Sequence, residues 1–362
     1  MDFRQVRQQG GIRLYEQLTE LENTARITRE NLIALLSDQA TDEAVFAAAD
    51  RVRAKYVGDA VHLRGLIEFS NICKQNCCYC GLRRDNPHVR RYRMNESEIM
   101  QLAKHAKALG FQTLVLQSGE DDYFTLERLT PIIQGIKKLG FAITLSIGEK
   151  SPETYAAYKE AGADRYLLRI ETTNRGLYKR FHPGMSFDNR RACLEFLRLA
   201  GYEVGTGCLV GLPGQTMADL ADDLLFFQAI DADMIGLGPF IPNQDTPLAK
   251  ADGGCFQLSR KTMALARLLR PDANIPATTA MEALNPQGRI LALQSGANVV
   301  MPNLTEGDYR NWYALYPGKA GLHDAPENNV AMIKQKIMAI GRTIGQDQGF
   351  RGRTPLRPHS GQ

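Results

Sequence analysis

The stretch that decides the fold is VHLRGLIEFS followed by NICKQNCCYC, residues 61–80. Its first half is rich in β-branched and apolar residues and predicts a strand, Val61–Ser70. Its second half carries Cys73, Cys77 and Cys80. Three thiolates can hold three irons of a four-iron, four-sulfur cube, which leaves the fourth iron open to a small molecule. The stretch therefore predicts a strand that delivers a reactive metal site.

Other uses of these cysteines fit the spacing less well. Cys78 is adjacent to Cys77, and neighbouring side chains diverge too much to reach one metal. His88 could complete a zinc site, but zinc sites favour paired C-x-x-C units. The count of 7 cysteines is odd, which argues against a disulfide framework. The remaining cysteines are interpreted as small buried apolar residues: Cys193, Cys208 and Cys255.

The composition is that of an ordinary globular protein, with 44% hydrophobic and 23% charged residues among 362. No apolar run approaches the ~18 residues of a membrane helix. Charged residues precede any apolar stretch at the N-terminus, unlike a secretory leader, so we predict a cytoplasmic protein. The net charge of +4 gives no case for a nucleic-acid partner.

Short β-type runs alternate with amphipathic stretches from residue 61 onward. This pattern predicts an α/β fold, and specifically a complete (β/α)8 TIM-type barrel over residues 61–350. An open doubly wound sheet is the main alternative. The expected strands are Val61–Ser70, Gln112–Gln117, Phe141–Ile147, Arg165–Ile170, Glu203–Val210, Asp233–Gly238, Ile275–Thr279 and Ala297–Met301.

Helical signals fill the intervals and both ends of the chain. Asn95–Leu109 has one apolar face, with Asn95 as a cap and Glu98 three residues later. Residues 1–60 show only helical patterns and predict an N-terminal helical extension that covers the barrel bottom and its first strand. Residues 351–362 are basic and contain prolines, and we predict a flexible tail.

Polar side chains follow several of the expected strands, where barrel enzymes place their active sites. Gly119 permits close approach of a ligand, and Glu120 could bind an ammonium group, although an exposed turn would explain both. Strand alternation places Arg169 and Glu171 on the same side of their strand. They could bind a ligand there or form a structural ion pair with each other. Arg190 lies early in the next helix, where a solvated arginine is the simpler interpretation.

Later strand ends add further candidates. The glycines of 205–214 lack the G-x-G-x-x-G spacing and a following acid, so a dinucleotide site is discounted. Thr278 and Thr279 are polar at a strand end and could face a substrate. Tyr313 and Tyr316 could share a face and close a pocket, although packing in the core explains them equally well.

The run Cys73-x-x-x-Cys77-x-x-Cys80, with Tyr79 before the last cysteine, resembles the signature of radical S-adenosylmethionine (SAM) enzymes. The resemblance implies a [4Fe-4S] cluster on these three cysteines, with Cys78 not a ligand. It also implies that the open iron chelates SAM and that the reduced cluster cleaves it to a 5′-deoxyadenosyl radical.

The same resemblance implies the residues that hold SAM. Ser118-Gly119-Glu120 is similar to the Gly-Gly-Glu motif that binds the methionine amine, with serine for the first glycine. The residues implied for SAM are Tyr79, Gln117, Ser118, Gly119, Glu120, Ser146, Arg169, Glu171, Arg190 and Leu209.

Within that superfamily the chain looks most like the [FeFe]-hydrogenase maturases of the HydE group, over nearly its whole length. The segments that carry this include Arg91-Tyr92-Arg93-Met94 and Tyr316–Lys319. The resemblance implies a closed internal cavity and action on a small organometallic substrate, a cysteine-bound Fe(CO)2CN synthon. It implies HydG and HydF as partners and ferredoxin or flavodoxin as electron donor. The implied catalytic or cavity-wall residues are Thr144, Ser146, Arg165, Thr278, Met301, Tyr313 and Tyr316.

Three alternatives stay open. A methylornithine-forming mutase would need pocket groups for an amino acid. A biotin-synthase-like enzyme would need a second cluster, and no cysteine follows Cys255 to hold one. A zinc-binding structural protein is an alternative of a different class. Analysis of the bound metal would distinguish it from the radical enzymes.

Overall fold

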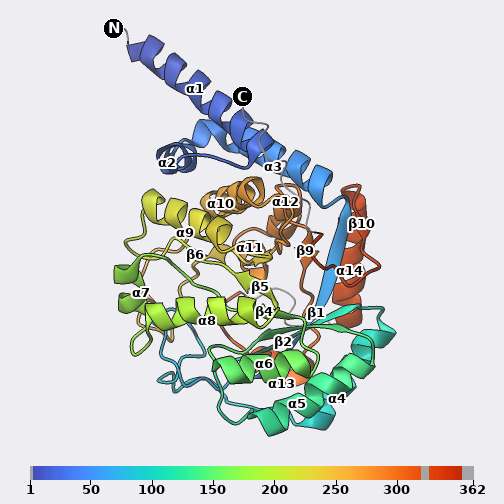
Figure 1. Cartoon of the computed structure of the whole chain (residues 1–362). Coiled ribbons are helices and arrows are strands. Elements are labelled where there is room, and N and C mark those ends of the chain that lie inside the picture. The colour runs from blue at the N-terminus through green and yellow to red at the C-terminus, as the bar shows by residue number, and fades with distance from the viewer. Residues whose placement is uncertain (1–2, 319–325, 353–362) are drawn as a thin grey trace.

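A parallel β-sheet curls through the centre of the molecule, with helices around it (Figure 1). This computed structural model describes residues 3–318 and 326–352. The main sheet has the order β10-β1-β2-β3-β4-β5-β7, and β9 also pairs with β1. Its strands are β1 (Ala60–Ser70), β2 (Thr113–Ser118), β3 (Ala142–Ser146), β4 (Arg165–Leu167), β5 (Glu203–Thr206), β7 (Met234–Ile235), β9 (Val299–Val300) and β10 (Thr343–Ile344).

A second sheet of two short parallel strands continues two of the predicted strands toward the carboxyl end. It pairs β6 (Leu209–Val210) with β8 (Gly238–Pro239). The predicted strands 203–210 and 233–238 are each split because the two backbones approach closely at Gly207. A Cβ on Gly207 would stand 1.8 Å from the carbonyl oxygen of Gly236. The prediction of one continuous strand in each place was wrong.

Helices follow most strands, as the α/β pattern predicts. After β1 they are α4 (Glu96–Ala108), α5 (Leu126–Lys138), α6 (Pro152–Glu160), α7 (Arg175–Phe181), α8 (Phe187–Leu199), α9 (Met217–Ala229), α10 (Phe256–Leu269), α11 (Thr279–Leu284), α12 (Gly288–Leu293), α13 (Gly307–Trp312) and α14 (Pro326–Ala339). The capping box of α4 is confirmed, since Asn95 Oδ1 accepts from the Glu98 amide and Glu98 Oε2 from the Asn95 amide.

The expected strand 275–279 is not a strand of this structure. Asn274 bridges to Met234, and Pro276 bridges to Val299, but no ladder forms between them. Thr279 instead begins α11. A proline cannot donate to a ladder, which limits pairing at this position to isolated bridges. These bridges link β7 toward β9, which lies beside β1.

The N-terminal helices are α1 (Phe3–Thr24), α2 (Arg29–Ser37), the 3-10 turn η1 (Gln39–Thr41) and α3 (Asp42–Tyr56). Figure 1 shows them stacked beyond α9 and α10. Here α3 packs against α10, and α2 against α9. The helical prediction is confirmed, but these helices cover the neighbouring helices more than the first strand. None of the helices within 3–318 and 326–352 is long and apolar enough to cross a membrane.

The segment after β10 closes one end of the curled sheet. The Gln348 carbonyl accepts from Arg165 Nη2 at 2.8 Å and from Thr113 Oγ1 at 2.9 Å. Arg351 forms ion pairs with Asp231, Asp233 and Asp272. Arg351 is therefore fixed, and the predicted flexible tail does not begin there. Residues 353–362 of that tail lie outside the described residues.

Candidate active site

The loop after β1 is held by side chains from distant parts of the chain. Asn71 Nδ2 donates to the carbonyls of Arg90 and Trp312, both at 2.8 Å. Arg91 donates to the carbonyls of Asn71, Leu82 and Arg83 at 2.7–2.9 Å. These bonds satisfy backbone groups that have no strand partner, and so they fix the path of the cysteine loop.

The three predicted ligand cysteines lie close to one another. Burial and the nearby Cys73 together raise the pKa of Cys80 to about 12, and burial together with Cys80 and Cys73 raises that of Cys77 well above its ordinary value. Burial also raises the pKa of Cys73. The Glu120 amide donates to Cys73 Sγ at 3.4 Å. Metal binding would displace these thiol protons, as it does at other thiolate sites.

The donor set fits a cluster. A Cβ on Gly119 would stand 2.7 Å from Cys73 Cβ, so only glycine lets β2 approach the cysteine loop this closely. Among the described residues, no three His, Cys, Asp or Glu side chains are placed around one metal ion.

Cys78 points away from this group. Its amide donates to the Phe181 carbonyl at 2.9 Å, and its sulfur lies 3.7 Å from the Arg180 carbonyl. It packs against a small apolar cluster that contains Leu177 and Phe181. This orientation supports its exclusion as a ligand.

Glu120 is held at the end of β2 by two donors. Gln75 Nε2 donates to Oε2 at 2.6 Å, and the Glu149 amide donates to Oε1 at 3.1 Å. Gly148 has φ +76° and lies so close that a Cβ would stand 1.9 Å from Glu120 Cγ. A glycine with left-handed backbone is thus required beside this carboxylate.

Arg190 is buried and joins the ends of three strands. Its Nε lies 2.6 Å from Glu149 Oε1, and its Nη1 donates to the Arg169 carbonyl at 2.6 Å. Its Nη2 is 3.8 Å from Glu120 Oε1. The simple expectation of a solvated arginine was wrong, because α8 turns this side chain inward.

Glu171 combines an unusual backbone with a buried carboxyl group. Its φ is +65°. The Glu171 amide donates to the Gly207 carbonyl at 3.0 Å, and the Leu209 amide donates to the Glu171 carbonyl at 3.2 Å. Its Oε2 forms an ion pair with Arg169 Nη2 at 3.1 Å, while burial raises its pKa. The predicted Arg169–Glu171 pairing is therefore present, in a strained turn of the kind often found at binding sites.

Tyr79 is fixed by His182. The Tyr79 hydroxyl lies 2.7 Å from His182 Nε2, and His182 Nδ1 lies 2.9 Å from the Tyr178 carbonyl. A carbonyl can only accept, so Nδ1 carries the proton and Nε2 accepts from Tyr79. Burial lowers the pKa of His182 to about 4, which keeps this ring neutral at pH 7.

A small cavity of ≈20 Å³ lies deeper inside the sheet. Thr144 and Met301, both predicted for the cavity wall, line it together with Arg64. Thr144 Oγ1 and Arg64 Nε are buried and form no hydrogen bond with any of the described residues. Arg165 is fully buried nearby, bound to Glu203 at 2.6 Å, and its Nη1 also lacks a partner. These donors face the interior of the fold with unused hydrogen-bonding capacity.

The other predicted residues are partly connected to this interior. Gln117 Nε2 donates to the Tyr313 hydroxyl at 3.2 Å, and Tyr313 is buried. Thr278 Oγ1 donates to the Leu237 carbonyl at 3.2 Å. Ser118 Oγ donates to the Gly119 carbonyl at 2.7 Å. Three more stand half-buried: Ser146, Leu209 and Tyr316.

Sequence reasoning missed several residues that the structure brings to the site. Glu149 comes three residues after the end of β3, and the rule that active sites follow strand ends would have found it. Arg64 lies within β1 and resembles any charged residue of an edge strand. His182 gave no signal, because its contact with Tyr79 joins segments 103 residues apart.

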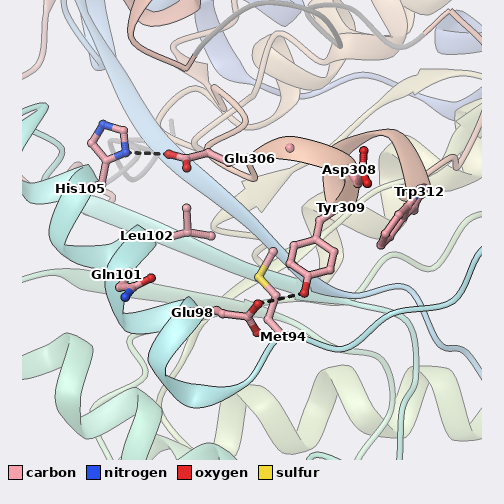
Figure 2. A pocket seen from close by; sticks show the side chains of 10 residues that line it. Met94, Glu98, Gln101, Leu102, His105, Glu306, Asp308, Tyr309 and Trp312 are labelled. Carbon is pink, nitrogen blue, oxygen red and sulfur yellow. Dashed lines mark hydrogen bonds and ion pairs between the residues drawn. The ribbon is translucent and has the colours of Figure 1, made fainter.

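A second, larger pocket of ≈650 Å³ lies outside the sheet, between α4 and the segment that leads into α13 (Figure 2). Figure 2 shows His105 paired with Glu306 and the Tyr309 hydroxyl bound to Glu98, both at 2.9 Å. It contains none of the predicted site residues.

Comparison with known proteins identifies the family of this chain. The family model "Radical SAM superfamily" matches residues 67–227. The chain is 50% identical over 343 residues to the [FeFe] hydrogenase maturase subunit HydE of Thermotoga maritima, which covers 95% of this chain and 98% of the relative. The chain belongs to the HydE family. It is therefore a radical SAM enzyme, and the family implies the [4Fe-4S] cluster and SAM.

Other relatives are more distant from this HydE family member. The 3-methylornithine synthase of Methanosarcina acetivorans is 31% identical over 280 residues, 76% of this chain and 79% of the relative. A crystal structure of methylornithine synthase has a TM-score of 0.80 at 27% identity and covers 91% of this chain and 97% of that chain. HydG from Carboxydothermus hydrogenoformans shares the fold, with a TM-score of 0.77 at 20% identity, over 94% of this chain and 80% of that chain.

Asp223 on α9 provides a test of how the Glu171 turn is held. Its Oδ1 accepts from the Thr173 amide at 2.6 Å and from Thr173 Oγ1 at 2.7 Å. Burial raises the pKa of Asp223 from 3.8 to about 7, so the folded state favours the protonated acid. The stabilisation is complete below pH ~3.8 and is lost as the pH rises through about 7.

We expect Asp223→Asn to flatten this dependence. The wild-type free energy of unfolding should fall by up to roughly 1.4 kcal/mol per pH unit through this group, and the variant should lose that slope. Urea unfolding at pH 5 and pH 8 gives the change in the free energy of unfolding for the wild type and for the variant. Equal slopes in the two proteins would contradict the assignment.

Proposed function

We propose that this enzyme acts in the maturation of [FeFe] hydrogenase, on a cysteine-bound Fe(CO)2CN synthon. The observation that carries the proposal is the 50% identity to a HydE subunit over 95% of the chain. We infer that HydG supplies the substrate, that HydF receives the product, and that these reactions take place in the cytoplasm.

The bridges at Asn274 and Pro276 support a complete barrel. They lie between β7 and β9, and β9 pairs with β1. We infer that they close the ring over residues 61–350, with residues 1–60 as a helical extension. A closed ring would separate the reacting atoms from bulk water.

Cys73, Cys77 and Cys80 would hold the cluster. When bound, the cluster supplies the electron that cleaves SAM to a 5′-deoxyadenosyl radical. Glu120 and Glu171 present carboxylates to the methionine end or ribose of SAM, and Arg190 presents a cation to its carboxylate. Arg190 would keep Glu149 as its partner while Nη2, which is 3.8 Å from Glu120, turns to the ligand.

We assign seven further residues to SAM: Tyr79, Gln117, Ser118, Gly119, Ser146, Arg169 and Leu209. Tyr79 would contact the adenine, with its hydroxyl already occupied by His182.

The interior donors support an anionic or strongly polar substrate. Arg64 and Arg165 are buried cations, and one donor of each has no partner. Burial of such groups is unfavourable unless something satisfies them. The cavity beside these donors has only ≈20 Å³, room for about one water, so we infer that a small ligand of the synthon, its cyanide, reaches them beside Thr144 and Met301. Thr278, Tyr313 and Tyr316 would line the wall toward SAM.

Anaerobic reconstitution tests the proposal. We expect about four irons per chain and a reducible cluster whose electron paramagnetic resonance spectrum changes when SAM is added. With reductant and the synthon, 5′-deoxyadenosine should form faster than with SAM alone. Zinc in place of iron, or no spectral response to SAM, would overturn the radical chemistry.

A second candidate is an amino-acid mutase, which the TM-score of 0.80 to methylornithine synthase favours. The same assay with amino acids in place of the synthon separates the two. Rearrangement of an amino acid without any response to the synthon would favour the mutase.

A further inference from the structure

Positive charge is concentrated in two segments near the cysteines. Residues 73–93 and 175–191 together hold eleven Lys or Arg against two Asp or Glu, whereas the whole chain has 44 against 40. Both acids are already paired, Asp85 with Arg84 at 2.9 Å and Asp188 with Arg175 at 2.5 Å. Three further cations pair with acids outside the segments: Lys74, Arg93 and Arg190. Among the described residues, six cations of these segments have no acidic partner and set the local potential: Arg83, Arg90, Arg91, Lys179, Arg180 and Arg191.

The two segments meet at Cys78. The Cys78 amide donates to the Phe181 carbonyl at the end of α7, which lies at the edge of the molecule (Figure 1). Arg83 and Arg180 both stand close enough to oppose the effect of burial on the Cys78 pKa. Lys179 precedes Arg180 in the last turn of α7, and both are exposed.

We call Arg83, Lys179 and Arg180 the basic face. Within residues 3–318 and 326–352, none of the three forms an ion pair with an acidic side chain, so their charge is available to a partner. The face lies over a buried apolar cluster of Leu177, Phe181, Leu212 and Phe240.

The position of the face indicates its partner. Cys78 is partly exposed and lies in the chain between two ligand cysteines, Cys77 and Cys80, so the covering over the cluster site is thin here. Glu120 and Arg190 face the same site from the strand ends, where SAM would bind. The rate of electron transfer falls steeply with distance. A reductant must therefore dock where little protein separates the cluster site from the surface, on a side that SAM does not occupy.

We propose that the basic face docks an acidic one-electron carrier protein. The carrier gives one electron to the cluster and is itself oxidised by one electron. The proposal rests on the proposed cluster at Cys73, Cys77 and Cys80, and it commits to a protein carrier. A nucleic acid is the other polyanion that such a face could attract.

Charge reversal tests the docking. The double variant Lys179→Glu/Arg180→Glu should bind flavodoxin, an acidic flavin carrier, at least about tenfold more weakly in calorimetry at low salt. Cluster reduction by flavodoxin should slow by a similar factor, while reduction by dithionite should keep the wild-type rate. Wild-type binding should also weaken as salt is raised. Lys104→Glu, an exposed site on α4, is the matched control and should change neither value.

Several results would overturn the docking proposal. They are unchanged flavodoxin binding by the double variant, an equal loss in Lys104→Glu, or a loss restricted to binding of a DNA duplex. If the double variant misfolds, Lys179→Gln removes one exposed charge and should give a smaller loss of the same kind. If the proposed function is wrong, the wild-type chain takes up no iron. Calorimetry still measures flavodoxin binding to the basic face in that case, so the two failures are distinguishable.

Discussion

Replacing Cys73, Cys77 or Cys80 with alanine is expected to abolish cluster assembly. Iron should fall from about four per chain to less than about one, because a cube held by two thiolates loses a protein ligand it cannot replace. Cleavage of SAM should fall to background. Iron analysis and 5′-deoxyadenosine formation under anaerobic conditions measure both.

Cys78→Ala is the matched control. Its sulfur lies against the Arg180 carbonyl in a separate apolar cluster, so the variant should keep its iron and its SAM cleavage. If Cys78→Ala also loses the cluster, the ligand assignment is wrong. If a single ligand variant keeps about four irons, another side chain must complete the site.

Gly119→Ala is expected to damage the site almost as much without touching a ligand. The new Cβ would stand 2.3 Å from the Ile72 carbonyl oxygen and 2.7 Å from Cys73 Cβ. Backbone atoms cannot yield as a flexible side chain does, so the cysteine loop must move. Such overpacking costs about 1–3 kcal/mol in stability. A shift of about 1 Å at a reacting group costs roughly 100-fold in rate.

The measurements are urea unfolding and single-turnover cleavage of SAM. Gly352→Ala is the control, because no atom of the described residues lies within 4 Å of its added Cβ and neither value should change. If Gly119→Ala cleaves SAM at the wild-type rate, the cysteine loop and β2 can move apart without consequence. That result would contradict the close packing described above.

Local patterns predicted the parts of this fold that depend on local physics. The strands β1, β2 and β3 lie within one residue of the predicted ranges, and Asn95 and Glu98 form the expected capping box, since both signals act within a few residues. Strand ends were predicted less well. At Gly207, close contact with the distant backbone of Gly236 decides where the ladder stops. At Pro276, the missing N–H limits pairing to isolated bridges.

The same division holds for the site. The spacing of Cys73, Cys77 and Cys80 indicated a cluster from the sequence alone, because ligand type and loop length are properties of the chain. The surroundings of Arg190 were not predictable. Its partners Glu149 and Arg169 come from other strand ends and meet it only when the sheet curls.

The sequence by itself determined the α/β class, the cysteine loop after the first strand and the resemblance to radical SAM enzymes. Only the tertiary structure decided that Cys78 turns outward beneath Arg180, that His182 fixes Tyr79, and that buried Arg64 faces the interior. The physical reason is that hydrogen bonds and burial join residues far apart in the chain, and no local pattern records which of them will meet.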